Sequence, residues 1–354
     1  MLLVIVYALG RWQTNEYAIT PGDATPVAPL IKIQGVKTNP HHDKIMLTDV
    51  YLSTLNVFQW IRAHFESHVQ FIAADELVEP GVSTNELEAQ GFLEMSDAKY
   101  AAEVAAFRAL GWSVPATRTG TVITGVVSPS PANTAKLKVG DEIVGVGSKN
   151  IYSGCQLVSD LHNDAPGTTL TLWVNRVKIS NVGVLSYGAI TSLKVTTAAV
   201  PSGLGLTGCP GVSGADRSWL GVSLEDGFSY HLPASVNINT ANIGGPSAGL
   251  AMTLTLINEL SGGSLTGHHI VAATGTMTVN GRVGAVGGVE EKAVAVHRAG
   301  ATYFIVPDGG GNVDAARAAD QPDLTILPVT SLKQALRDLQ RLGGVKPVAL
   351  TKPS

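Results

Sequence analysis

Apolar residues recur along the first part of the chain with the periods of strands and helices. Leu30–Ile33 and Lys44–Leu52 are rich in β-branched and apolar residues, so they are predicted to be strands. Ser96 can N-cap a helix that ends at Gly111. The apolar residues on one side of this helix are Val104, Phe107 and Leu110. The pattern over 12–115 therefore predicts a mixed α/β N-terminal region.

A more β-rich pattern occupies residues 116–205. The run Thr121–Val127 is β-branched, and Gly140-Asp141 forms a turn between two apolar segments. A short helix with Leu157 and Leu161 four residues apart precedes the strand Thr168–Val174. We expect this part of the chain to form a β-rich domain.

A strand, a glycine-rich turn and a helix follow one another in the third part of the chain. Val236 and Ile238 alternate in the strand, and Pro246 suits the first turn of the helix, where no N–H is needed. The buried stripe of the helix is Leu250, Leu254 and Ile257. Ser247 is therefore expected at a helix N-terminus, where free N–H groups can stabilise a developing oxyanion.

Further elements follow at regular intervals. The strand Ile270–Thr274 precedes Asn280-Gly281, which is a strong hairpin signal. A second helix begins near Val286 and runs to Arg298, with Gly300 as its C-terminal cap, and the strand Thr302–Val306 comes next.

Composition and charge exclude several classes of protein. Only 15% of the 354 residues are charged and 45% are hydrophobic, which excludes an intrinsically disordered protein. The net charge of −4 argues against nucleic acid as a partner. Two cysteines, Cys155 and Cys209, are too few for a disulfide scaffold and lack metal-ligand spacing.

The apolar run Met1–Leu9 is too short to span a bilayer alone, since a span needs about 20 residues. It is either a buried strand or the remnant of a membrane anchor over residues 1–11. Among the histidines, His41-His42 is interpreted as a solvent-exposed pair. His64 and His68 have the i, i+4 spacing that would let both bind a metal ion from one helix face. Because no H-E-x-x-H motif accompanies them, no metal site is predicted.

Gly245-Pro246-Ser247-Ala248-Gly249 satisfies G-x-S-x-G, the nucleophile elbow of α/β-hydrolases. A hydrolase triad needs an acid and then a histidine further along the chain. The last histidine is His297, and no Asp lies between it and Ser247. Glu259, on the helix that Ser247 opens, is the non-adjacent acid available. The motif by itself therefore gives a Ser-His-Asp triad little support, and an esterase using Ser247 is a remote alternative.

Several motifs in the third part of the chain resemble the proteolytic domain of the Lon proteases. They are GGPSAGL, TGT-T-NGRV, VGGVEEK and HRAGAT-FIVP, in that order over 216–345. The resemblance implies an α+β fold in which Ser247 is the nucleophile, Lys292 the general base and Thr274 a hydroxyl that orients Lys292. Gly245, Pro246 and Ala248 form the turn and the oxyanion region.

The β-rich pattern over 116–205 resembles a PDZ domain of the circularly permuted bacterial kind. PDZ domains bind extended peptides by adding a strand to a sheet edge. The segment Val114–Gly120 before Thr121 lacks a Gly-Leu-Gly-Phe-like carboxylate cradle. A peptide ligand and a purely structural spacer both stay open.

A lysine base must be neutral, and the reference pKa of lysine is about 10.4. A position in the first turn of a helix and burial beside Val286 and Val289 would both lower the pKa of Lys292. Glu290 and Glu291 oppose this fall unless they point to solvent. A surface lysine paired with these glutamates is the alternative.

Two positions depart from the family pattern. Gly244 stands where ATP-dependent Lon proteases carry an acidic residue, and Thr276 where they carry a glutamate. The chain contains no G-x-x-x-x-G-K-[ST] phosphate loop. We therefore predict an ATP-independent serine endopeptidase that needs no cofactor and cleaves unfolded or flexible polypeptides through an acyl-enzyme. The rival is an inactive, membrane-tethered adaptor that carries a PDZ domain.

The resemblance also has consequences for assembly and location. Lon-type domains form hexameric rings, so a homo-oligomer is expected. The combination of GGPSAGL, a PDZ-like domain and Met1–Leu9 resembles membrane-anchored Lon-like proteases of Gram-positive bacteria. It implies a single N-terminal anchor and an extracytoplasmic protease domain, with a cytoplasmic location as the alternative.

Overall fold

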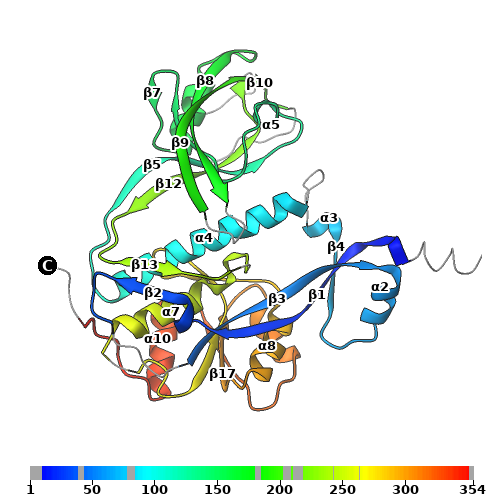
Figure 1. The fold of residues 1–354 in the computed structure, drawn as a ribbon, viewed down its shortest axis with the longest axis vertical. Helices are drawn as coiled ribbons and strands as arrows, with labels where there is room; N and C mark the ends of the chain where they lie inside the picture. Colours follow the sequence, from blue (N-terminus) through cyan, green and yellow to red (C-terminus); the bar gives the residue numbers. More distant parts are fainter. Residues whose placement is uncertain are drawn as a thin grey trace, which may run out of the picture. The chain divides into compact units, whose positions relative to one another are not determined.

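The chain folds into two compact units, and the second interrupts the first in sequence. A computed structural model describes residues 10–38, 44–77, 84–179, 185–201, 209, 218–241, 243–262 and 264–350. Unit 1 comprises residues 10–114 and 232–350, and unit 2 comprises Pro115–His231. Met1–Leu9 and His41-His42 lie outside the described residues. Figure 1 shows the elements of each unit.

Unit 1 is built on a six-stranded sheet with the order β18-β17-β14-β3-β1-β4. The bounds are β1 Gln13–Pro26, β3 Lys44–Asn56, β4 Gln70–Ala73, β14 Ile270–Ala273, β17 Tyr303–Pro307 and β18 Thr325–Val329. β14 pairs in parallel with both β3 and β17, whereas β3 and β1 are antiparallel. A strand from the first part of the chain is thus the direct neighbour of strands that follow Ser247. The sequence predicts separate regions over 12–115 and 216–345, whereas in the structure one sheet contains strands from both.

Two small ladders and the helices complete unit 1. Two small ladders, β2 with β13 and β15 with β16, are both antiparallel. The strands are β2 Ile31–Gln34, β13 Ser235–Ile238, β15 Thr276–Met277 and β16 Val283–Gly284. The helices are η1 Ala28–Leu30, α2 Val57–Ala63, α3 Ala74–Leu77, α4 Thr84–Ala109, η2 Pro246–Ala248, α7 Gly249–Leu260, α8 Val289–Arg298, α9 Asn312–Ala318 and α10 Leu332–Arg341. The predicted strands at 30–33, 44–52, 270–274 and 302–306 are confirmed within one to a few residues.

The helix predicted to begin at Ser96 begins earlier, at Thr84. Gly91 lies inside α4, where a glycine is tolerated at a cost of about 1 kcal/mol relative to alanine. The apolar side is as predicted, because Val104, Phe107 and Leu110 are all buried. The predicted start is wrong because Ser96 precedes an apolar stripe and so fits the pattern of an N-cap, although the helix extends about three further turns before it.

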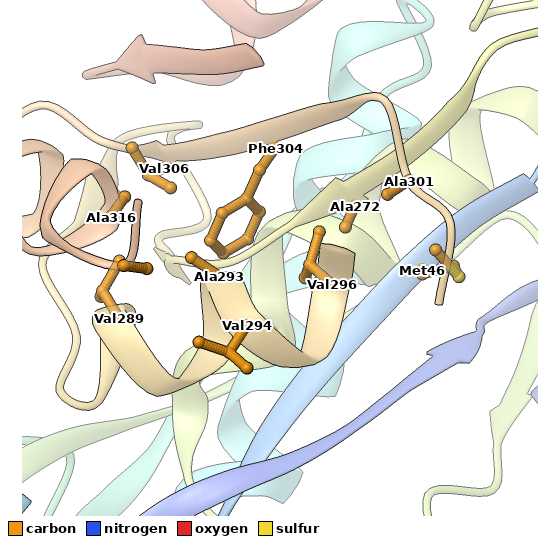
Figure 2. Packing of buried hydrophobic residues seen from close by; sticks show 11 residues of the cluster. Met46, Ala272, Val289, Ala293, Val294, Val296, Ala301, Phe304, Val306 and Ala316 are labelled. Atoms are coloured by element: carbon orange, nitrogen blue, oxygen red, sulfur yellow. The ribbon is translucent and has the colours of Figure 1, made fainter. Parts of the chain in front are cut away.

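One face of the sheet is covered by α8, as Figure 2 shows. Val289, Ala293 and Val296 of α8 pack against Phe304 and other side chains of the sheet. The acids of α8 lie in its first turn and its basic residues in the last, which suits the helix dipole. This apolar layer fixes the N-terminus of α8, the position of Lys292.

Helix α7 is buried on all sides, since nearly every residue from Gly249 to Leu260 is buried. α4 lies along α7 and also contacts η2, the short turn that contains Ser247. The helix that follows Ser247 is therefore held inside the unit, and α4 forms part of its cover.

Unit 2 contains a sheet with the order β12-β5-β6-β8-β9, and β7 pairs with β6. The bounds are β5 Ala116–Val126, β6 Glu142–Val146, β7 Lys149–Asn150, β8 Thr169–Ile179, β9 Leu185–Thr196 and β12 Val222–Tyr230. The smaller elements are α5 Pro131–Thr134, α6 Gly154–His162, β10 Ala198–Ala199 and β11 Ser218–Trp219. Ile123, Leu157 and Leu172 are fully buried in its core, so the predicted β-rich domain with one amphipathic helix is present.

A disulfide joins Cys155 at the start of α6 to Cys209 within unit 2. This bond is not predictable from the sequence, because a separation of 54 residues carries no local signal. The bond attaches the chain between β10 and β11 to α6.

Candidate active site

Ser247 lies in the middle of η2, between the end of β13 and the start of α7. Gly245 has a φ of 84°, a conformation that favours glycine, and Pro246 begins the turn. Ser247 is half-buried, whereas Ala248 is buried beside it. The predicted placement of the serine at a helix start thus holds, with a single 3-10 turn preceding the α-helix.

The end of β14 holds the turn through backbone contacts. The carbonyl of Ser247 accepts hydrogen bonds from the N–H of Gly275 at 2.8 Å and from Oγ1 of Thr274 at 3.3 Å. In return, the N–H of Leu250 donates to the carbonyl of Gly275 at 3.1 Å. Ser247 and Thr274 are therefore direct neighbours, and Thr274 is fully buried.

Helix α4 supports the same turn from the other side. The N–H of Gly245 donates to the carbonyl of Gly91 at 2.7 Å. A Cβ on Gly244 would lie 3.3 Å from the carbonyl carbon of Gly91. The close approach of α4 gives a physical reason for glycine at 244, where ATP-dependent relatives carry an acid. The sequence predicts no functional role for the segment that forms α4.

The contact with α4 also shows which residues of the oxyanion region can offer a backbone N–H to a substrate. The N–H of Gly245 is used by Gly91, and Pro246 has no N–H. The N–H groups of Ser247 and Ala248 lie at the start of a helix, where backbone donors lack intrahelical partners. Of the predicted residues, Gly245 and Pro246 shape the turn, and Ser247 and Ala248 carry the available donors.

Lys292 lies in the first turn of α8 and is only 3% exposed. Its Nζ donates a hydrogen bond to the carbonyl of Gly287 at 3.0 Å. Burial lowers the pKa of Lys292 to about 8, although the negative charges of Asp49 and Glu291 act in the opposite direction. An appreciable fraction of the side chain is therefore neutral at slightly alkaline pH.

The backbone before α8 is fixed by Asn312, which is buried at the start of α9. Its side chain accepts a hydrogen bond from the N–H of Val286 at 3.0 Å and donates one to the carbonyl of Val286 at 2.7 Å. This double contact positions the adjacent Gly287, whose carbonyl accepts from Lys292. Gly288, with a φ of 65°, then lets the chain enter the helix.

The two glutamates beside Lys292 differ in environment. Glu290 pairs with His68 Nδ1 at 3.1 Å. Glu291 is buried, and among the described residues its Oε2 has no hydrogen-bond partner. Burial raises the pKa of Glu291. A surface lysine paired with these acids, the alternative interpretation, does not describe this buried side chain.

His64 and His68 do not share a helix face, because α2 ends at Ala63. His64 stacks on Phe71 and lies against Trp60, while His68 turns to Glu290. Within the part of the chain that the structure describes, no group of three His, Cys, Asp or Glu side chains could hold a metal ion.

The arrangement thus joins Ser247 to Thr274 and places Lys292 on the opening turn of α8 in the same unit. Among the described residues, no hydrogen bond links Ser247 Oγ to Lys292 Nζ. Catalytic hydrogen bonds are often long without substrate and tighten in the substrate complex. Chemically, these groups offer a hydroxyl, a buried amine of lowered pKa and helix-start N–H donors.

Comparisons with known proteins agree with this picture. The family model described as "Lon protease (S16) C-terminal proteolytic domain" matches residues 231–340. The family model "PDZ domain" matches residues 108–183. The chain combines a PDZ domain with a Lon-type proteolytic domain. Its mixed α and β architecture is the predicted fold class.

Individual relatives match short parts of the chain. A Lon protease of Chloroflexus aggregans is 37% identical over 93 residues, which is 26% of this chain and 11% of that protein. A Lon protease of Clostridioides difficile is 49% identical over 63 residues, 18% of this chain and 8% of that protein. The chain thus matches about a tenth of the length of these relatives. The similarity supports a peptidase of the Lon type.

One solved structure similar to this chain is the PDZ domain of an SdrC-like protein from Listeria monocytogenes. It is 15% identical, covers 30% of this chain and 90% of that chain, and has a TM-score of 0.23. This value is too low to add to the assignment, which rests on the family models.

The segment before Thr121, which lacks a carboxylate cradle, forms an inner strand of the PDZ-unit sheet. Ala116–Val126 is strand β5, which lies between β12 and β6 in the sheet. The segment before Thr121 therefore does not border an edge. β12 and β9 are the two end strands of this sheet. Trp219-Leu220-Gly221 leads into β12, with a φ of 81° at Gly221.

Proposed function

We propose that this chain is an ATP-independent serine endopeptidase with a Ser247–Lys292 dyad. The observation that carries the proposal is Lys292, which is buried on the first turn of α8 with a pKa lowered to about 8. It lies in the same unit as the Ser247 turn and Thr274. A lysine needs this environment to act as a base near neutral pH, whereas a structural lysine is normally exposed.

The reaction follows from these groups. Neutral Lys292 Nζ takes the proton of Ser247 Oγ while Oγ bonds to the peptide carbonyl carbon. The carbonyl oxygen becomes an oxyanion, which the N–H groups of Ser247 and Ala248 stabilise. Lys292 then gives its proton to the leaving amine, and the C–N bond breaks to leave an acyl-enzyme. A water that loses a proton to Lys292 hydrolyses the ester and regenerates Ser247.

Thr274 has a positioning role in this proposal. Its hydroxyl hydrogen-bonds to the carbonyl of Ser247, so it fixes the turn that carries the nucleophile. The family resemblance assigns the Thr274 hydroxyl to the orientation of Lys292. Both effects hold the dyad in a geometry that favours proton transfer.

Unfolded or flexible polypeptides are the proposed substrates. The absence of a G-x-x-x-x-G-K-[ST] phosphate loop from the sequence supports a reaction without nucleotide. A folded substrate would first have to be opened, because its peptide bonds are held in structure. The β12 edge of the PDZ domain is proposed to add a substrate segment as a further strand. A spacer role is the alternative.

A homo-oligomer, hexameric by family resemblance, and an extracytoplasmic location at a bacterial membrane complete the proposal. The disulfide between Cys155 and Cys209 supports an oxidising compartment, since disulfides are rare in the cytosol of most organisms. The apolar run Met1–Leu9 supports membrane association. Among the described residues, none of the helices has the length and apolarity of a membrane span.

The test is degradation of casein, an unstructured substrate, without nucleotide. Wild type should cleave it, Ser247→Ala should lose at least about 10⁴-fold in kcat, and Lys292→Ala about 10²- to 10⁴-fold. Lys194→Ala, in unit 2, is the matched control and should retain full activity. A serine-reactive phosphonate should label wild type but not Ser247→Ala.

Equal activity in wild type and both dyad variants would contradict the dyad. Absence of cleavage and of labelling in wild type would favour the rival adaptor, for which Gly244 and Thr276 are the supporting residues. The same experiment therefore decides between the two functions.

A further inference from the structure

Thr48 on β3 carries a buried hydroxyl that the resting protein does not use. The side chain is 2% exposed, and among the described residues its Oγ1 has no hydrogen-bond partner. Buried polar groups are normally hydrogen-bonded, because an unmet donor or acceptor in the interior costs stability. Valine has nearly the same shape and suits a strand equally well without this cost. Packing alone therefore does not explain a threonine at this position.

Thr48 faces the start of α8. Met46, two residues earlier on β3, belongs to the apolar cluster that α8 covers (Figure 2). Two residues later, Cγ1 of Val50 lies 2.8 Å from the position that a Cβ on Gly288, the residue before α8, would take. Side chains two residues apart on a strand point to the same face. Thr48 therefore lies on the α8 side of the sheet, between these two contacts.

The register of the sheet brings Thr48 next to a residue of the candidate site. β14 pairs in parallel with β3, and Ala272 is the partner of Met46. Carried two residues further along both strands, this register places Thr274 beside Thr48 on the same face. β3 also contacts η2, the nucleophile turn, and α8, the helix of the base. Thr48 therefore lies on the strand that both elements of the dyad contact.

Lys292 lacks hydrogen-bond acceptors at the same place. Among the described residues, its buried Nζ donates one hydrogen bond, to the carbonyl of Gly287. A lysine that has taken the proton of Ser247 holds three N–H donors. One donates to Gly287, one faces the atom that next receives the proton, and the third needs another acceptor. The hydroxyl of Thr274 already donates to the carbonyl of Ser247, whereas that of Thr48 is unused.

We propose that Thr48 is a positioning residue of the base, and that its Oγ1 accepts a hydrogen bond from the ammonium of Lys292. The inference rests on the dyad proposed above and adds a second hydroxyl to that of Thr274. The bond forms as Nζ takes the proton of Ser247 Oγ, so it stabilises the charge that develops on the lysine during acylation. Because the bond is absent from the resting protein, Thr48 should affect kcat and leave KM unchanged.

The experiment compares Thr48→Val with Thr48→Ser in the degradation of casein without nucleotide. Thr48→Val removes the hydroxyl, so kcat should fall about 10- to 100-fold at unchanged KM, the factor for one hydrogen bond to a charged group. Its Tm should equal or exceed that of wild type, because an unpaired buried hydroxyl is lost. Thr48→Ser keeps the hydroxyl and loses a buried methyl group, so its Tm should fall while its kcat stays within about threefold of wild type.

The matched control is Thr255→Val, at a buried threonine of α7 whose hydroxyl donates to the carbonyl of Ala251 at 2.9 Å. This variant loses a structural hydrogen bond, so its Tm should fall and its kcat should stay as in wild type. The opposite effects expected in Thr48→Val distinguish a hydroxyl that acts on the base from one that stabilises the fold.

Three results would overturn the inference. A wild-type kcat in Thr48→Val, with Ser247→Ala and Lys292→Ala impaired, would remove Thr48 from the site and leave the dyad in place. A lower Tm of Thr48→Val together with a lower kcat, or failure of this variant to fold, would assign the hydroxyl to the fold. Absence of casein cleavage in wild type would overturn the peptidase proposal and this inference together.

Discussion

At the scale of single residues, the environment of Lys292 decides the chemistry of the site. Its type and its place at a helix start were predicted from sequence, and the fall in its pKa follows from burial. The burial of Glu291 and the influence of Asp49 were not predicted, because both depend on β3 and on packing between distant segments. The sequence thus identifies the reactive side chains, whereas tertiary packing determines whether they are charged.

Lys292→Met should lower peptidase activity about 10²- to 10⁴-fold and stabilise the protein at neutral pH. The pKa of Lys292 falls from 10.5 to about 8, so the buried ammonium costs about 3 kcal/mol below pH 8. This cost disappears as the pH rises from about 8 to 10.5, since the folded state then holds a neutral amine. Urea unfolding at pH 7 and at pH 10 measures it. A variant that is less stable than wild type at pH 7 would contradict this account.

Asp49→Asn should shift the alkaline activation of the enzyme to lower pH. The carboxylate of Asp49 favours the charged form of Lys292, so its removal lowers the pKa of the lysine further. The measurement is kcat/KM against pH for the variant and wild type. Asp338→Asn, on α10, is the control and should leave the midpoint in place. A shift to higher pH would show that Asp49 does not act through this charge.

At the scale of elements, α4 connects the first part of the chain to the nucleophile turn. Strand and helix types were predicted well from periodicity, because apolar alternation and helical stripes are local signals. The start of α4 at Thr84 and its contact with Gly245 were missed. In the sequence, the only sign of this close backbone approach is the glycine at each of the positions Gly91 and Gly244. Because glycines occur throughout the chain, that sign could not be recognised.

Gly91→Val should slow acylation of Ser247, whereas Gly91→Ala should not. A Cβ at position 91 lies 3.7 Å from the nitrogen of Gly245, which is ordinary contact, but the methyl groups of valine would press on the turn. Displacement of the nucleophile by about 1 Å can cost about 100-fold in rate. The rate of phosphonate labelling measures the effect, with Tm as the control for folding. Equal labelling rates in both variants would rule out this role of α4.

At the scale of the whole molecule, the main surprise is that the PDZ unit interrupts the proteolytic unit. The boundary near Pro115 was predicted from the change in apolar pattern, and the second boundary lies near Leu232. The parallel pairing of β14 with β3 joins segments more than two hundred residues apart in sequence. Local periodicity contains no information about such a partner, so the shared sheet could not be predicted.

The disulfide should stabilise unit 2 and leave the chemistry of unit 1 unchanged. A bond that closes a loop of 54 residues contributes about 4 kcal/mol in the chain-entropy description. Cys155→Ser with Cys209→Ser should therefore lower the free energy of unfolding of the PDZ unit, as measured in urea. The rate of phosphonate labelling of Ser247 should stay as in wild type. A lower labelling rate would show that the two units are coupled.

The central claim is that buried Lys292 is the base that activates Ser247, and the pH dependence of acylation tests it most directly. The rate of phosphonate labelling of wild type should rise with pH through a single midpoint at about 8, the pKa of Lys292. Lys292→Met should lose this rise together with most of the labelling. A wild-type profile that is flat from about pH 6 to about pH 9, or a Lys292→Met variant with the wild-type profile, would contradict the claim.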